Sequence, residues 1–202
     1  MKKKTNLKGL VAGTAAMLLS IVPNQKINSQ TNPLHSKNRA KAGIDCHVWH
    51  DKTMSETYQY VFTINQGYER KIANRPYYNL QWGIGERRGG AGETHLRRFN
   101  VESGIEFTLT NPNNQDFRLY GKGGGRFTYF LLDSMISLNP EREFSEKVFG
   151  FGPYVGAGFE KKMKNGLLFF SEIVYNNMNA EAYDKKRNFS GTSGKFGVKI
   201  PF

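Results

Sequence analysis

The chain has 202 residues, a formal net charge of +12, a mean hydropathy of −0.58 and a single cysteine, Cys46. This length allows one domain with a sizeable core, and one cysteine excludes an internal disulfide. After residue 22, no apolar run reaches the 18 residues of a transmembrane helix, so we expect no helical membrane span in the mature chain.

The first 29 residues have the composition of a secretory signal peptide. Four lysines precede residue 9, and the mostly apolar stretch that follows, 10–22, is too short to span a membrane. We expect cleavage after Ser29, a flexible periplasmic leader over 30–41 and a folded domain over 42–202. Loss of the signal removes five lysines and lowers the formal charge to about +7. No nucleic-acid-binding motif is present, so we expect no nucleic-acid partner.

From residue 42 onward, apolar and polar residues alternate with a period of two, which is typical of β-strands. The pattern predicts eight strands, at 42–50, 57–72, 77–85, 96–110, 117–132, 147–162, 167–177 and 191–202. Three connections are short (near Asn74, Asn113 and Asn165) and four are longer (50–56, 86–95, 133–146 and 179–190). Strict alternation of short and long connections is typical of an antiparallel up-and-down barrel in an outer membrane, with short periplasmic turns and longer extracellular loops.

The two faces of the predicted strands differ in chemistry. One face collects Phe, Tyr, Trp, Leu and Ile, and the other collects Gly, Asn, Thr and charged residues. The interior of an eight-stranded barrel is only wide enough to be filled by side chains, so the glycine-rich charged face suits the inside and the rings suit lipid. With the faces exchanged, the same pattern would give a soluble ligand-binding barrel.

Charged residues inside a barrel must be paired, because a stranded charge costs several kcal/mol. We therefore predict an ion-pair network that fills the lumen and leaves no large pore. Its predicted members are Glu102, Glu106, Lys122, Arg126, Glu160, Glu172 and Lys195. Arg118 and Lys199 share this facing, but we expect them to reach water at the barrel mouths.

Two similar segments predict where strands meet the membrane boundary. The segments 67–74 and 158–165 share a Gly-aromatic-Glu-basic order, and each ends at a short turn. We expect Tyr68 and Phe159 at the lipid interface and the basic residues beside them at the headgroups.

Four arginines surround the second long loop: Arg87, Arg88, Arg97 and Arg98. Because arginine binds phosphate in a bidentate manner, these side chains are candidates for contacts with lipopolysaccharide phosphates. Solvated loop charge is an equal alternative. The segment 121–126 is rich in glycine, but it lacks the spacing of a phosphate-binding loop and no helix follows it.

The last strand carries the closest family resemblance. Its sequence ends in Phe196-Gly197-Val198-Lys199-Ile200-Pro201-Phe202, in which Phe196, Val198, Ile200 and Phe202 alternate with other residues. This end resembles the C-terminal insertion signal of outer-membrane barrels, which the barrel-assembly machinery reads. Pro201 departs from the usual pattern. Together with the signal peptide and the loop lengths, 42–202 resembles the small OmpA/OmpX-like eight-stranded barrels.

The resemblance concerns architecture, and three functions stay open. We expect an integral outer-membrane barrel with a structural or surface-interaction role, surrounded by lipid and lipopolysaccharide. The alternatives are a lipid A-modifying enzyme and a barrel subunit of a secretion or conjugation machine. His50 and His95 lie near the outer rim, but neither has a serine two residues away to form a hydrolase pair. We expect no catalytic residues, metal or cofactor.

Overall fold

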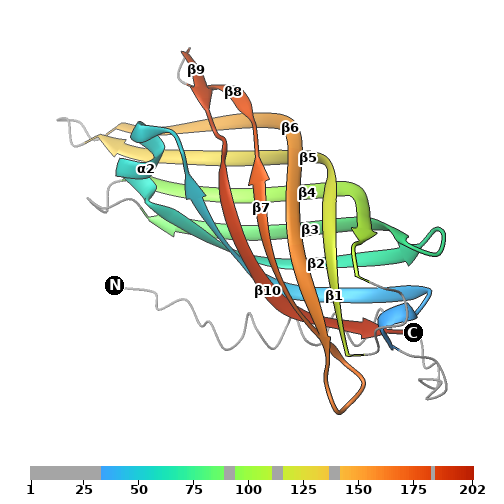
Figure 1. The fold of residues 1–202 in the computed structure, drawn as a ribbon. Helices are drawn as coiled ribbons and strands as arrows, with labels where there is room; N and C mark the ends of the chain where they lie inside the picture. The colour runs from blue at the N-terminus through green and yellow to red at the C-terminus, as the bar shows by residue number, and fades with distance from the viewer. Residues whose placement is uncertain (1–32, 89–93, 111–115, 137–141, 183–184) are drawn as a thin grey trace.

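The computed structural model describes residues 33–88, 94–110, 116–136, 142–182 and 185–202, so the predicted signal peptide lies outside the described residues (Figure 1). Ten strands form one antiparallel sheet: β1 (Asn38–Trp49), β2 (Tyr60–Lys71), β3 (Pro76–Arg88), β4 (Thr94–Thr108), β5 (Phe117–Ile136), β6 (Arg142–Lys162), β7 (Leu168–Asn176), β8 (Asn179–Ala182), β9 (Lys185–Asn188) and β10 (Gly191–Pro201). Two short helices lie within the described residues, η1 (Pro33–His35) and α2 (Lys52–Tyr58). Within the described residues, no helix has the length and hydropathy to cross a membrane.

Eight of the strands, β1 to β7 and β10, close into a barrel. Each strand pairs with its neighbour in the chain up to β7, and pairing of β10 with both β7 and β1 completes the ring. The predicted all-β, eight-stranded up-and-down barrel is therefore confirmed. The remaining pair, β8 and β9, forms a hairpin that extends β7 and β10 beyond breaks at 177–178 and 189–190.

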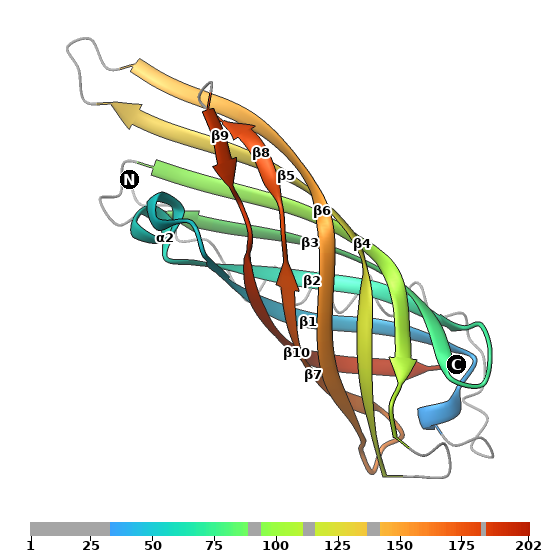
Figure 2. The same ribbon diagram turned by 45° about the horizontal axis from the view of Figure 1, so that its top comes forward.

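The two ends of the barrel differ in the length of their connections. The strand ends near the C-terminus are joined by short segments, whereas at the other end β5 and β6 project beyond their neighbours (Figures 1 and 2). These two strands are the longest, with 20 and 21 residues, and remain paired up to Ile136 and Arg142. The predicted loop at 133–146 is thus largely strand.

Strand β1 begins four residues earlier than the sequence analysis expected. Asn38 pairs with Arg70 of β2, and Arg39 pairs with Pro201 of β10. The expected leader over 30–41 is therefore too long, because β2 and β10 offer backbone partners to 38–41. Arg39 and Lys41 point inward and are buried. They alternate with Ala40, which is also buried, and with half-buried Ala42.

The first long connection contains a helix rather than an open loop. Asp51 caps α2, and its side chain accepts a hydrogen bond of 3.0 Å from the backbone N–H of Met54, which satisfies one of the free amides at a helix start. Met54 and Tyr58 are buried. The predicted strand over 57–72 consequently begins only at Tyr60.

The short turns are shaped by local chemistry. Gly166 has φ +83°, a conformation that residues with a Cβ rarely adopt, and its N–H donates to the carbonyl of Met163 at 3.0 Å. The turn between β2 and β3 is closed by a bond of 3.0 Å from the Ile72 N–H to the Pro76 carbonyl. Both lie where Asn165 and Asn74 predicted them, and the core of the third predicted turn, 111–115, lies outside the described residues.

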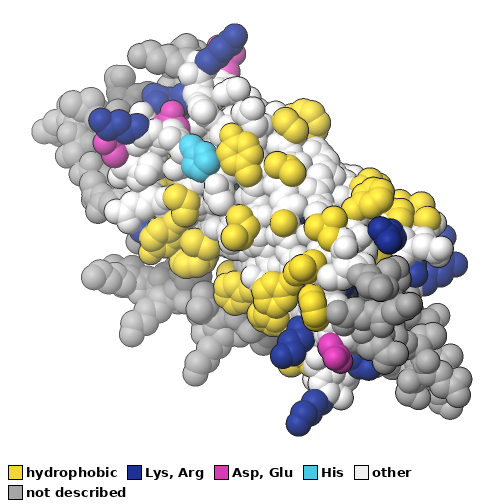
Figure 3. Space-filling model, viewed as in Figure 1, with side chains coloured by type: hydrophobic (Ala, Val, Ile, Leu, Met, Phe, Trp, Pro, Cys, Tyr) yellow, Lys and Arg dark blue, Asp and Glu magenta, His cyan; other side chains and the backbone are white. Residues whose placement is uncertain are grey.

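The exterior of the barrel carries a band of apolar side chains, visible as yellow patches in Figure 3. On β6 this band runs from Phe149 to Phe159 and ends at exposed Lys147 on one side and Lys161 on the other. It covers 11 residues, which is the length that a tilted strand needs to cross a bilayer. The predicted facing, with rings outward and charges inward, holds through this band.

Candidate functional site

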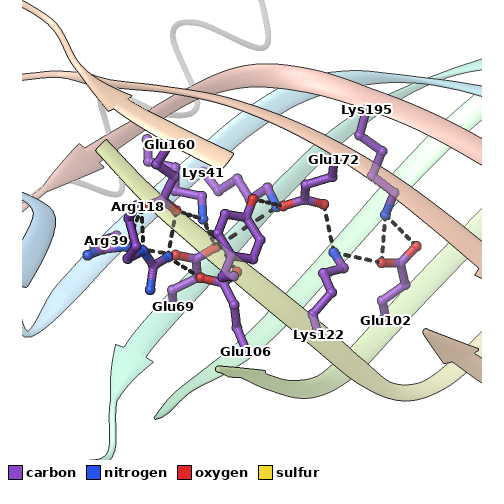
Figure 4. Close-up of polar contacts among 12 residues, drawn as sticks. Arg39, Lys41, Glu69, Glu102, Glu106, Arg118, Lys122, Glu160, Glu172 and Lys195 are labelled. Carbon is purple, nitrogen blue, oxygen red and sulfur yellow. Dashed lines mark hydrogen bonds and ion pairs between the residues drawn. The ribbon is translucent and has the colours of Figure 1, made fainter. Parts of the chain in front are cut away.

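The lumen near the turn end is occupied by charged side chains that contact one another (Figure 4). Glu160 of β6 lies at the centre. It accepts from Arg118 Nε at 2.8 Å and from Arg39 Nη1 at 3.0 Å, and it also contacts Lys199. Lys199 Nζ lies 2.6 Å from Glu69 Oε1, and Arg118 contacts Glu106. All these side chains are 3% exposed or less.

A second centre lies closer to the loop end. Glu102 of β4 accepts from Lys195 Nζ at 2.6 and 2.7 Å and also contacts Arg126. Arg126 in turn donates to the Asn176 side-chain oxygen at 2.9 Å. Cross-strand neighbours create part of this cluster, since Glu102 and Arg126 occupy paired positions on β4 and β5.

Lys122 joins the two centres. Its Nζ lies 2.7 Å from Glu172 and 3.8 Å from Glu102, and Glu172 also binds Lys41. We call the connected set the lumen network. Its members are Arg39, Lys41, Glu69, Glu102, Glu106, Arg118, Lys122, Arg126, Glu160, Glu172, Lys195 and Lys199. The lumen network therefore contains seven basic side chains and five carboxylates. Gly158 has no side chain and so leaves space for the Tyr120 ring, whose hydroxyl donates to Glu172 at 2.8 Å.

The structure brings the seven residues predicted for the lumen into this network. It adds Arg39, Lys41 and Glu69, and it corrects the expectation for Arg118 and Lys199, which are 2% and 0% exposed instead of reaching water. Arg39 and Lys41 were missed because they were assigned to the leader. Their alternation with Ala40 and Ala42 was the available signal.

Three carboxylates, Glu69, Glu106 and Glu160, lie within 4.8 Å of one another and form the one acidic group of metal-binding geometry in the described part of the chain. Arg39, Arg118 and Lys199 lie against their oxygens. These cations already compensate the negative charge that a metal ion would neutralise. The three carboxylates therefore form ion pairs with these basic side chains and do not form a metal site.

Beyond the network, the lumen changes to apolar side chains at the loop end. We call this cluster the apolar cap: Trp49, Met54, Tyr58, Val61, Leu96, Phe130, Leu132, Val148, Met178 and Phe189. Phe130 and Phe189 stack with ring centroids 4.8 Å apart, and Trp49 lies 5.7 Å from Phe130. Helix α2 contributes two of the buried side chains, so the first long connection folds into the mouth of the barrel.

The four predicted phosphate-binding arginines do not share one surface. Arg97 is exposed on the outer face of β4, whereas Arg98, the next residue, points into the lumen and is 1% exposed. Arg98 is therefore corrected to an interior residue. Arg87 is half-buried; its Nε donates to the Tyr58 carbonyl at 3.3 Å, and its guanidinium lies 4.2 Å above the Tyr60 ring. The Arg88 side chain lies outside the described set.

The outer rim carries two outward-facing histidine pairs. His95 Nε2 lies 2.7 Å from Glu86 Oε1, and His50 Nε2 lies 3.0 Å from Thr192 Oγ1. On the same exterior, the hydroxyl oxygens of Ser103 and Tyr78 are 3.0 Å apart. Among the described residues, neither histidine forms a hydrogen bond with a serine.

The C-terminal strand closes the barrel with its apolar side outward. Phe196 is exposed, and Val198, Ile200 and Phe202 are half-buried on the same exterior. The Phe202 N–H donates to the Asn38 carbonyl at 3.0 Å, and the Tyr68 and Phe202 rings are 6.4 Å apart. The end of β10 is therefore held to β1 by a backbone hydrogen bond, and its terminal ring lies on the exterior beside Tyr68.

Comparison with known proteins finds similarity in structure and none in sequence families. No family model and no curated protein matches the chain. Among solved structures, Neisserial surface protein A aligns with a TM-score of 0.57 at 10% identity, covering 83% of this chain and 98% of that one. OprG of Pseudomonas aeruginosa aligns with 0.58 at 11% identity, covering 83% and 97%. Ail of Yersinia pestis, in complex with the heparin analogue sucrose octasulfate, aligns with 0.51 at 14%, covering 82% and 99%.

The closed eight-stranded up-and-down ring is the fold that this chain shares with these solved barrels. Its exterior carries an apolar band and its lumen carries charged side chains. Its architecture is that of the small OmpA/OmpX-like barrels, as the sequence predicted.

Proposed function

We propose that this protein is a closed outer-membrane barrel with a structural or surface-interaction role, and that it is not a diffusion pore. The observation that carries the proposal is the double filling of the lumen. The lumen network occupies the half near the turns, and the apolar cap occupies the mouth at the loop end. The solved neighbours are outer-membrane barrel proteins, which supports the same general role.

The two fillings would exclude solutes for different reasons. A solute that enters the network half must displace ion pairs and strand buried charges. A polar solute at the cap would lose its water among Trp49, Phe130 and Phe189 without gaining hydrogen bonds. Because Arg87 holds the end of α2 at Tyr58 and Tyr60, the cap is fixed to the rim of β3.

Electrical recording tests this proposal. The purified full chain inserted into planar bilayers should give no regular conductance steps, whereas a porin inserted in the same way should. Large, uniform steps from the wild-type barrel would overturn the proposal. A barrel in which Trp49, Phe130 and Phe189 are replaced by glycine should still fail to conduct in steps, because the lumen network remains.

The charged side chains of the outer rim support lipopolysaccharide as a binding partner. Arg97 faces outward just beyond Phe99, the last exposed ring on β4, at the level where phosphates of the outer leaflet would lie. We expect the variant R87Q/R88Q/R97Q to co-purify with less lipopolysaccharide, measured as bound lipid phosphate per barrel. The variant K161Q/K162Q/K164Q, at the opposite end, should retain it. Equal retention in both variants would contradict the contact.

The two alternatives from the sequence have their own tests. A lipid A-modifying enzyme would change the acylation of extracted lipid A on incubation with the purified barrel, and a machine subunit would co-purify stoichiometrically with other envelope proteins. The His95–Glu86 pair makes His95→Ala the variant to compare in the first assay. Recognition of β10 by the barrel-assembly machinery is also part of the proposal, supported by the outward apolar residues that end this strand.

A further inference from the structure

The two ends of the barrel differ in charge. At the turn end, seven basic side chains are exposed or half-buried: Lys37, Arg70, Lys71, Arg75, Lys161, Lys162 and Lys164. The one acidic side chain on this surface, among the described residues, is Asp116. Figure 3 shows dark blue side chains gathered there with a single magenta one. We call the seven residues the turn-end basic cluster.

The loop end has no such excess among the side chains that the structure describes. Its basic residues are Lys52, Arg87, Arg97, Lys147, Lys186 and Arg187. Its acidic residues are Asp51, Glu56, Glu86, Glu146 and Glu181. The near equality of basic and acidic residues leaves the described part of this rim close to neutral, so among the described residues the excess of positive charge lies at the turn end.

The position of two cluster members shows what the cluster faces. Lys161 follows Phe159 by two residues on β6 and is exposed, so it points in the same outward direction as the lipid-facing ring. Its cross-strand neighbours are Phe117 and Phe169, both exposed apolar residues. Arg70 follows Tyr68 on β2 in the same manner and pairs with Tyr78. These cations therefore lie beside the apolar band rather than below the barrel.

The remaining members lie one step further from the band. Arg75, Lys162 and Lys164 are exposed in or next to the short turns. The Lys71 N–H donates to the Lys37 carbonyl at 2.8 Å, so the start of β1 and the end of β2 bring two members together. Cations at the edge of an apolar band, with long side chains that can extend to the surface, match the layer of lipid phosphates.

We propose that the turn-end basic cluster binds anionic phospholipid headgroups in the membrane leaflet on the turn side. This inference rests on the proposed function, in which the turn side is the periplasmic leaflet of the outer membrane. Basic residues beside a membrane surface attract anionic lipids, and each adds to the binding. The lateral position of Lys161 and Arg70 favours lipid over a polymer of the periplasm, because a polymer would contact the turns and not the edge of the band.

The test uses the full mature chain in nanodiscs of three parts phosphatidylcholine to one part phosphatidylglycerol. Lipids retained after transfer to detergent are counted by native mass spectrometry. We expect wild type to retain phosphatidylglycerol in preference, and K161Q/K162Q/K164Q to lose about fivefold or more of this preference. The matched control K52Q/K147Q/K186Q removes three exposed lysines from the loop end and should keep it. Raised salt should weaken the wild-type preference.

Three results would overturn the proposal. They are an unchanged preference in the turn-end variant, an equal loss in both variants, and displacement of phosphatidylglycerol by soluble peptidoglycan fragments, which would identify a periplasmic polymer as the partner. Each variant is first checked for the change in gel migration on boiling that a folded barrel shows. Should the triple variant not fold, K161Q and K147Q are compared as a single pair in the same assay.

Discussion

Replacing Glu160 with glutamine is expected to lower the free energy of unfolding by about 3–5 kcal/mol. The substitution keeps the shape of the side chain and removes the negative charge that Arg39, Arg118 and Lys199 contact. All four groups are buried, so water cannot replace the lost carboxylate. Urea unfolding of the barrel in phospholipid vesicles, followed by tryptophan fluorescence, measures the change.

Two comparisons make this result specific. Glu56→Gln breaks an exposed ion pair with Lys52 at 3.8 Å and should cost about 0.5 kcal/mol or less. The double variant E160Q/R118Q should be less destabilised than the sum of its single variants, because it removes one of the stranded cations together with the carboxylate. Additive effects in this cycle, or equal effects of E160Q and E56Q, would contradict the lumen network as described.

The second large effect concerns the exterior. Val155 lies near the middle of the apolar band on β6, is 59% exposed and is flanked across the strands by Gly123 and Tyr175. Val155→Arg should destabilise the barrel in vesicles by about 2–4 kcal/mol, because the charge would lie in hydrocarbon near the bilayer midplane. In a soluble barrel the same exposed position would tolerate arginine.

A depth comparison on the same strand provides the control. Phe149 lies at the loop-side edge of the band, next but one to Lys147, so Phe149→Arg should cost about 0–1 kcal/mol relative to Phe149→Ala. The free energy of unfolding of Val155→Arg is likewise compared with that of Val155→Ala, so that the loss of the valine side chain contributes equally to both variants. Equal costs at the two depths, measured by urea unfolding in vesicles, would contradict the membrane-spanning assignment of this band.

The strands and their facing could be predicted because they depend on local features. A period of two determines which residues share a face, and the bulk of Phe149 and Phe159 against the charge of Glu160 identifies the outside. Turn chemistry at Gly166 fixes where two strands reverse. The contacts within the lumen network, in contrast, depend on register and on how strands far apart in sequence meet, as with Arg39 and Glu160.

Other features were missed because the interior changes character along the strands. Leu96 and Val148 point inward at the loop end, next to outward Arg97 and Lys147, whereas Glu160 points inward next to outward Phe159. A rule that assigns apolar residues to lipid fails beyond the edge of the band. Arg98 was assigned to the outer rim although it lies within the predicted strand 96–110, where its alternation with Arg97 and Phe99 already indicated an inward side chain.

The change from a charged to an apolar interior at the loop end has a consequence for how fast the assembled barrel could leave the membrane. In the membrane orientation of the proposed function, the apolar cap can form only after its segments, including Met54 and Phe189, have crossed to the outer side, where burial against one another shields them from water. Withdrawing a strand toward the periplasm would first require this small core to come apart. On this orientation the apolar cap would oppose extraction of a strand, while the charged side chains lie deeper in the lumen.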